Sequence, residues 1–221
     1  MSSSIQPINV EQLKQMLTAD DQLCIIDTRS AVEFTDGFIP ESVFVGQEGN
    51  FVEWMLSLFS PDTRIVLVTT AGKEGECITL LADAGFKHIE GYLKGGFEAW
   101  RKAGEPIDMI VNVDAAELAM DIPFDEHLVI LDVRRPVEFA EGHIENAVNL
   151  PLVDIKDPGN LAQLDEHSNL YIHCARGYRS VIAASLLKQQ GFNNLRNVSG
   201  GWDFIKHTKG FKIVKETSAL N

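Results

Sequence analysis

Compact apolar runs alternate along the whole chain with segments in which apolar residues recur at helical spacing. The apolar runs predict buried strands over residues 23–26, 65–68, 128–131 and 170–172. The periodic segments predict helices over residues 10–17, 75–84, 115–120 and 180–190. Strands that alternate with helices indicate an α/β fold, in which a mostly parallel sheet is covered by helices on both faces.

The alternating pattern occurs twice, at a constant offset of 105 residues. Residues 27–43 align with residues 132–148, sharing aspartate, arginine, a Val-Glu-Phe triplet, glycine, isoleucine and valine. Farther along, residues 94–97 match residues 199–202. The chain therefore reads as a tandem duplication. We expect one α/β domain over residues 1–106 and a second over residues 107–221, each within the usual size range.

Composition narrows the functional classes. The chain has 221 residues, of which 45% are hydrophobic and 23% charged, and its net charge is −13. Such an acidic protein is not expected to bind nucleic acid or an anionic membrane surface. No apolar run approaches the roughly 20 residues of a membrane span. Residues 1–7 lack a basic region followed by an apolar core, so we expect no signal peptide and a cytoplasmic location.

The strongest candidate for chemistry is Cys174, which directly follows the predicted strand 170–172 and precedes the helix 180–190. Ligands of open α/β sheets bind at that end of the strands. A loop curling back over the sulfur would aim backbone N–H groups at it, and the helix N-terminus and nearby arginines would add positive potential. These effects favour the thiolate, the nucleophilic form. We therefore predict Cys174 as the catalytic residue and the residues after it as the substrate-binding loop: Ala175, Arg176, Gly177, Tyr178, Arg179 and Ser180.

The first copy lacks this chemistry. Alignment of the copies puts Thr69 or Thr70 opposite Cys174, and the first copy keeps the loop glycines but not the arginines. Glu74 and Glu76 would disfavour an anion there. A threonine hydroxyl is a poor nucleophile without an activating base. The remaining cysteines are expected to pack, Cys77 inside the following helix and Cys24 in the core of a strand. The wide spacing of the three cysteines indicates neither a disulfide framework nor a zinc site. The first domain is therefore expected to be catalytically inactive.

Several other polar residues invite a catalytic interpretation, but a structural one is favoured. Asp132, Arg134 and Glu138 have equivalents in the first copy, which has no thiol, so an ion-pair or capping role is expected. His143 and Trp202 are expected to pack, and Gly200-Gly201 to permit close backbone approach. His173 is not expected to serve Cys174 directly, because adjacent strand residues point to opposite faces. Tyr178 is expected either to line the pocket mouth or to cap the loop.

In this order and spacing, these motifs resemble the rhodanese family in its two-domain sulfurtransferase form. The resemblance covers nearly the whole chain and rests on four motifs: residues 132–134, 138–147, 174–180 and 200–202. It implies a three-layer α/β fold in each copy and a cysteine that carries sulfur as a persulfide. The loop is most similar to those of rhodanese domains that occur alone or fused to persulfide-oxidising enzymes.

The sequence thus predicts a sulfurtransferase that relays sulfur through Cys174, from thiosulfate or a low-molecular-weight persulfide to cyanide or a thiol. Arg176 and Arg179 indicate that the donor is a small anion. No metal or organic cofactor is expected, and the oligomeric state is left open. A cysteine phosphatase or arsenate reductase of related fold is one alternative, although the four residues between Cys174 and Arg179 suit sulfur better than a tetrahedral phosphate. A non-enzymatic sulfur carrier or sensor is the other.

Overall fold

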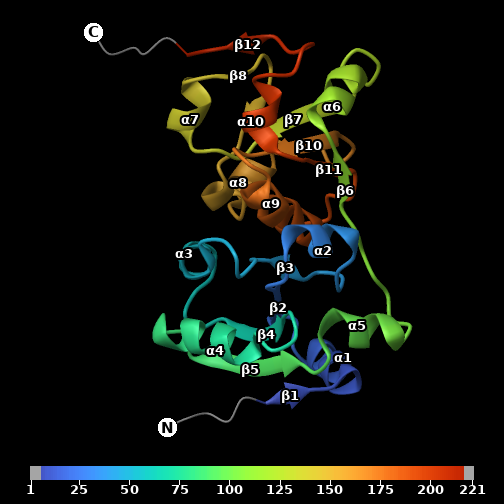
Figure 1. Ribbon diagram of the computed structural model, residues 1–221, viewed down its shortest axis with the longest axis vertical. Coiled ribbons are helices and arrows are strands. Elements are labelled where there is room, and N and C mark those ends of the chain that lie inside the picture. Colours follow the sequence, from blue (N-terminus) through green and yellow to red (C-terminus); the bar gives the residue numbers. More distant parts are fainter. Residues whose placement is uncertain (1–5, 217–221) are drawn as a thin grey trace. The chain divides into compact units, whose positions relative to one another are not determined.

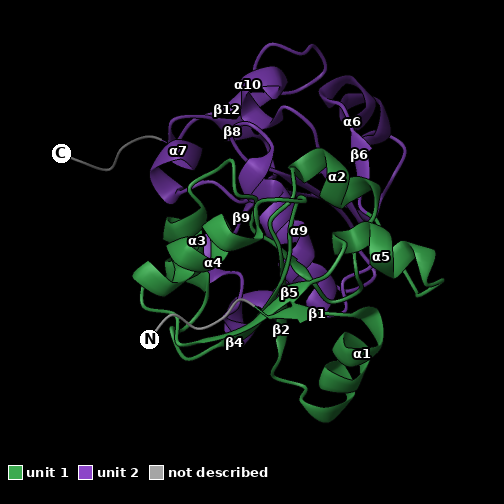
Figure 2. Cartoon of the chain, turned by 60° about the horizontal axis from the view of Figure 1, so that its bottom comes forward, with its two compact units in different colours: residues 1–109 green, residues 110–221 purple. Residues whose placement is uncertain are grey.

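A computed structural model describes residues 6–216 of the chain. The expectation that there is no signal peptide was drawn from residues 1–7, of which residues 1–5 lie outside the described residues. The chain forms two compact units, residues 1–109 (unit 1) and residues 110–221 (unit 2), which are coloured separately in Figure 2. Each unit is an α/β domain with a mostly parallel sheet flanked by helices, which confirms the predicted fold class. Within residues 6–216, no helix has both the length and the apolar character needed to span a bilayer.

Unit 1 contains five strands in the order β1-β5-β4-β2-β3, all of them parallel. A buried cluster on one face joins Leu13, Phe97 and Trp100 to the strands, so α1 and α5 cover that face. The elements, labelled in Figure 1, are β1 Pro7–Ile8, α1 Val10–Ala19, β2 Cys24–Asp27, α2 Ala31–Asp36, β3 Val43–Phe44, α3 Phe51–Leu58, β4 Arg64–Val68, α4 Glu74–Asp83, β5 His88–Leu93 and α5 Gly96–Lys102.

Unit 2 repeats this sheet in the order β6-β11-β10-β7-β9, and β12 pairs antiparallel with β8 outside it. Leu118 of α6 and Ile205 of α10 pack with Ile130, Tyr171 and Val198 on one face of the sheet. The elements are β6 Val111–Val113, α6 Ala115–Asp121, β7 Leu128–Asp132, α7 Pro136–Ala140, β8 His143–Ile144, β9 Val148–Asn149, η1 Leu152–Asp154, α8 Pro158–Leu161, β10 Asn169–His173, α9 Tyr178–Gln189, β11 Leu195–Val198, α10 Gly201–Ile205 and β12 Ile213–Val214.

The four apolar runs correspond to two neighbouring strands in each sheet: β2 and β4 in unit 1, and β7 and β10 in unit 2. Each of these strands is buried on both faces and so is continuously apolar. The outer strands β1, β3, β6 and β9 are only two or three residues long, too short to leave a pattern in the sequence. The helix predicted from residue 180 begins two residues earlier, at Tyr178, because Gly177 ends the loop with a φ of 102°.

Candidate active site

The candidate site of unit 2 lies where β10 ends, in the middle of the sheet. β10 is hydrogen-bonded to β7 on one side and β11 on the other, and Cys174 is the first residue after it. The cysteine is 1% exposed. The amide of Val133 donates to the carbonyl of His173, and in unit 1 Thr28 donates to Val68 in the same way. Residue 174 therefore corresponds to Thr69, which decides between the two threonines left open by the sequence.

The loop after Cys174 turns one backbone amide directly toward the sulfur. The Gly177 N–H donates to Sγ over 3.1 Å, as the sequence predicts for a loop that curls back. Gly177 adopts a left-handed conformation, which an L side chain disfavours, and it immediately precedes α9. Ser180, on the first turn of α9, places its Oγ 3.6 Å from Sγ and donates to the Gly177 carbonyl. The sulfur thus lies at the N-terminus of a twelve-residue helix, where negative charge is stabilised.

A second helix start holds the other side of the loop. The amides of Trp202 and Asp203 donate to the carbonyls of Cys174 and Ala175, over 2.7 and 3.1 Å. Gly201 makes this contact sterically feasible, since a Cβ there would lie 2.3 Å from the Cys174 carbonyl oxygen. The predicted close backbone approach is confirmed for Gly201, whereas a Cβ at Gly200 would meet the Phe204 side chain. These bonds satisfy two backbone carbonyls of the loop, those of Cys174 and Ala175.

Both loop arginines are bound to carboxylates of their own unit. Arg179 donates from both terminal nitrogens to the two oxygens of Glu138, over 2.7 and 2.8 Å. The Arg179 guanidinium holds the pKa of the Glu138 carboxyl below its usual range, and Glu138 raises the pKa of Arg179. Arg176 is 86% exposed and pairs with Asp203 over 3.2 Å. Glu138 therefore combines its expected capping role with an ion pair to the candidate loop.

The predicted structural ion pair lies beneath the site. Arg134 and Asp132 are both buried, and the arginine also donates to the Gly142 carbonyl. The Arg134 guanidinium stacks on Trp202, 4.3 Å from the ring centroid. Trp202 is half-buried rather than a full core residue. The structural interpretation of Asp132 and Arg134 agrees with these contacts.

His173 is fully buried beside this pair. Its Nδ1 lies 3.3 Å from the Cys174 carbonyl, and its Nε2 lies 3.6 Å from the Asp132 carboxylate. Burial lowers the pKa of His173, which favours the neutral ring. His143, by contrast, stacks on Phe139 at 3.7 Å and so packs as expected. Neither contact involves the Cys174 sulfur, which agrees with the expectation that His173 does not serve that sulfur directly.

The corresponding loop of unit 1 has a different lining. Thr69 is buried, and Gly72 keeps the left-handed conformation of Gly177 with a φ of 86°. Cys77 lies inside α4 as predicted, where burial raises the pKa of its thiol and its Sγ lies 3.6 Å from Thr28 Oγ1. Cys24 is half-buried, so its assignment to the core was wrong. Cys24 is the first residue of β2, and the other three residues of that strand are buried.

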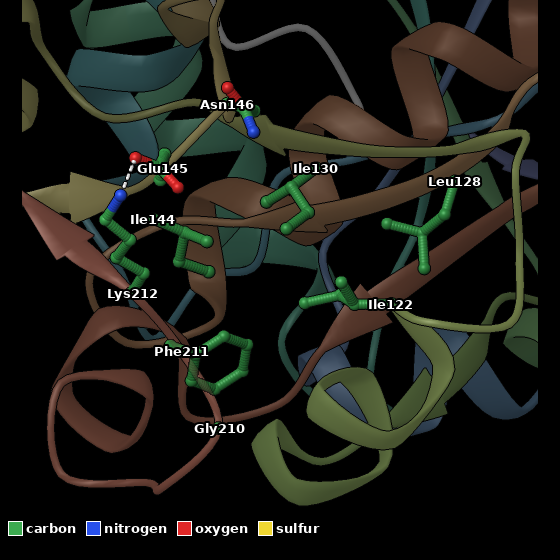
Figure 3. A pocket seen from close by; sticks show the side chains of 9 residues that line it. All are labelled: Ile122, Leu128, Ile130, Ile144, Glu145, Asn146, Gly210, Phe211 and Lys212. Atoms are coloured by element: carbon green, nitrogen blue, oxygen red, sulfur yellow. Dashed lines mark ion pairs between the residues drawn. The ribbon is translucent and has the colours of Figure 1, made fainter.

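A separate cavity of about 320 Å³ lies in unit 2. Figure 3 shows the side chains of Ile130, Ile144 and Phe211 facing a common space, with the ion pair between Lys212 and Glu145 at one side. None of its lining residues belongs to the candidate loop. Among residues 6–216, no group of three or more His, Cys, Asp or Glu side chains is arranged to hold a metal ion.

Two residues that contact the candidate loop were not assigned to the site from the sequence, Glu138 and Asp203. For Glu138 the sequence does contain a signal, because one loop position carries opposite charges in the two copies. Glu138 keeps its equivalent in Glu33, whereas the position of Arg179 is occupied by Glu74 in the first copy. The glutamate is therefore present in both copies, but the arginine is present only in the second. This difference points to a second role for Glu138, beside the capping role common to both copies. No comparable signal marked Asp203.

Comparisons with known proteins agree with the duplicated fold. Residues 9–103 and 114–207 each match the family described as "Rhodanese-like domain". The chain is 34% identical over 108 residues to "Putative sulfur carrier protein YrkF" of Bacillus subtilis, covering 49% of this chain and 55% of that protein. It is 31% identical over 93 residues to "Sulfurtransferase" of Allochromatium vinosum, covering 42% of this chain and 85% of that protein.

One solved structure among the matches is that of the rhodanese-like domain of an Anabaena protein. It is 25% identical, covers 51% of this chain and 85% of its own chain, and superposes with a TM-score of 0.44. The present chain thus spans about half the length of the Bacillus relative, 55%, and most of the Allochromatium relative, 85%.

Proposed function

Because the chain belongs to the family of rhodanese-like domains, we propose that it is a sulfurtransferase in which Cys174 of unit 2 carries the sulfur. The observation that carries the proposal is the Gly177 amide donating to Cys174 Sγ at the start of α9. A backbone donor and a helix N-terminus both stabilise negative charge on that sulfur. Ala175, Arg176, Gly177, Tyr178, Arg179 and Ser180 form the proposed donor-binding loop.

The transfer proceeds in two displacements. The Cys174 thiolate attacks the outer sulfur of the donor, thiosulfate or a low-molecular-weight persulfide. A bond forms between Sγ and the outer sulfur, the donor's S–S bond breaks, and its electron pair leaves with sulfite or a thiolate. The resulting persulfide extends the negative charge by one sulfur within the same cradle, and Ser180 Oγ can turn to donate to it. A thiolate or cyanide then attacks the outer sulfur and releases Cys174 as thiolate.

Unit 1 is catalytically inactive in this proposal. Thr69 replaces the thiol, and Glu74 and Glu76 place carboxylates at the start of α4, where a sulfur anion would otherwise be stabilised. Lys73 is paired with Glu76 over 2.9 Å. The left-handed glycine and the helix start are retained, but nothing in the loop generates a nucleophile.

The phosphatase alternative is disfavoured by the state of Arg179. Phosphate recognition by arginine relies on its two parallel N–H donors. In unit 2 those donors are directed to Glu138. The proposed sulfur relay does not require these donors, because the Gly177 amide and the N-terminus of α9 face the transferred sulfur.

The decisive experiment is steady-state transfer from a donor panel of thiosulfate, mercaptopyruvate and glutathione persulfide, with cyanide as acceptor. We expect parallel initial-rate lines and a loss of at least about 10³-fold in Cys174→Ser. Cys77→Ser and Cys24→Ser are matched thiol controls that should retain transfer. Thr69→Cys placed in the Cys174→Ser background should not restore it.

Mass spectrometry separates the remaining alternative. A persulfide adduct on Cys174 without turnover would favour a sulfur carrier over an enzyme. Intersecting lines, or faster turnover of an aryl phosphate than of any sulfur donor, would overturn the sulfurtransferase mechanism.

A further inference from the structure

We propose that Glu138 sets the charge preference of the donor site by neutralising Arg179, so that unit 2 prefers an organic persulfide to the thiosulfate dianion. The inference rests on the proposed sulfurtransferase function and makes its donor class more specific. It refines the expectation from the sequence that Arg176 and Arg179 select a small anionic donor, because both arginines are paired with carboxylates.

The pair between Arg179 and Glu138 is strong for an ion pair near the surface. It is bidentate, and the side chains are only 18% and 31% exposed. Bidentate pairs of this kind are the strongest charge-assisted hydrogen bonds, and partial burial reduces screening by solvent. The negative charges of the Cys174 thiolate and of the buried Asp132 also raise the pKa of Arg179. The guanidinium is thus permanently charged, and an ionised carboxylate already balances that charge.

The second loop arginine does not replace it. Arg176 is 86% exposed, and its partner Asp203, which also pairs with Lys206, is 42% exposed. Exposed pairs of this kind contribute little and exchange readily with solvent ions. A dianion entering the loop therefore meets one loosely held cation, with two carboxylates close to the arginines. The outer sulfur of an organic persulfide needs only the Gly177 amide and the start of α9.

The repeat separates the capping role of this glutamate from its role at the loop. Glu33 accepts from the Ser30 amide over 3.1 Å, as Glu138 accepts from the Arg135 amide over 3.1 Å. The capping function is therefore common to both units. The partner at the loop differs, since Arg179 corresponds to Glu74 in unit 1. Glu33→Gln is accordingly a matched control for the loss of a carboxylate at this cap.

The test compares kcat/KM for thiosulfate and for glutathione persulfide, whose carboxylates lie several bonds from the transferred sulfur. In Glu138→Gln, we expect the ratio of thiosulfate to glutathione persulfide to rise about tenfold, because Arg179 regains an unbalanced charge. Glu138→Asp should bring the ratio back toward the wild-type value. Glu33→Gln should leave it within about twofold of wild type. Asp203→Asn should shift it in the same direction as Glu138→Gln by about two- to threefold.

The outcomes are distinguishable. Equal losses for both donors in Glu138→Gln, with an unchanged ratio, would mean that Glu138 only positions Arg179, and the proposal would fail. If Glu138→Gln does not fold, as judged by its circular dichroism, the double variant Glu138→Gln/Arg179→Gln carries the test, because it removes both charges of the pair together. A balanced pair adds no net charge, so the ratio should stay within about twofold of wild type, and a larger fall overturns the proposal. A wild-type protein that transfers sulfur from neither donor would instead contradict the proposed function itself.

Discussion

The two units share one framework and differ in what it supports. In unit 1, Arg29 binds Asp27, donates to the Gly37 carbonyl and stacks on Phe97 at 4.3 Å. In unit 2, Arg134 makes the equivalent contacts with Asp132, Gly142 and Trp202, again at 4.3 Å. These buried pairs are present whether or not a thiol is nearby. They therefore belong to the fold, and chemistry must be sought in the residues that differ.

The differences that bear on sulfur chemistry lie in one loop and at the start of the following helix. Cys174, Arg176, Arg179 and Ser180 correspond to Thr69, Ala71, Glu74 and Gly75 in the first unit. Both loops keep the left-handed glycine, at 72 and 177. Glu138 shows that a residue common to both units can acquire a second partner when the loop changes. A duplicated chain thus supplies its own control for separating structural residues from functional ones.

The largest effect is expected when the shared ion pair is broken in each unit. Arg29→Met and Arg134→Met each leave a buried carboxylate without its partner, which typically costs about 3–5 kcal/mol. We expect calorimetry of the full chain to show destabilisation of similar size for both variants. Sulfur transfer, measured below the unfolding temperature, should fall only in Arg134→Met, whose site underlies Trp202 and the Cys174 carbonyl. Equal losses of sulfur transfer in the two variants would contradict the assignment of the transfer site to unit 2 alone.

A smaller effect is expected from the glycines that begin α5 and α10. Gly96 and Gly201 both have positive φ, at 57° and 54°. A Cβ at Gly96 would lie 2.9 Å from the Thr69 carbonyl oxygen, whereas at Gly201 it would lie 2.3 Å from that of Cys174. Backbone strain alone gives about 1–2 kcal/mol for Gly96→Ala, and the tighter contact brings Gly201→Ala to about 2–5 kcal/mol. Urea unfolding measures both, and the reverse order would count against the tighter approach in unit 2.

The smallest effect is a pH dependence confined to unit 2. Burial lowers the pKa of His173 below its unfolded value of about 6.5, so below that pH the unfolded chain binds more protons. The free energy of unfolding is therefore unaffected by His173 above about pH 6.5. Below that pH, protonation of His173 in the unfolded chain lowers it by at most about 1.4 kcal/mol per pH unit. His173→Val, which installs the residue found at Val68, should remove this slope. Thermal unfolding of wild type and variant at pH 7.5 and 5.5 measures it, and identical slopes would refute a buried neutral histidine.

Much of the fold was predictable because its signals are local. Double-sided burial made β2, β4, β7 and β10 continuously apolar, and the repeat identified equivalent positions without any knowledge of contacts. The same comparison showed that Asp132 and Arg134 are structural. The half-buried position of Cys24 was missed, since apolar neighbours in a strand do not reveal which end of it the helices cover.

The sequence by itself determined that two α/β units follow one another and that only the second carries a thiol after a central strand. It also showed a glycine in the loop, at 177, and a glycine pair at 200–201, whereas their positive φ values and the contact of Gly201 with the Cys174 carbonyl came from the structure. Only the tertiary structure decided what the loop arginines bind. Glu138 lies 41 residues from Arg179 in the chain, and they meet because the pairing of β7 with β10 brings the helices after these strands together. Charge balance at a site depends on such neighbours, which sequence spacing does not encode.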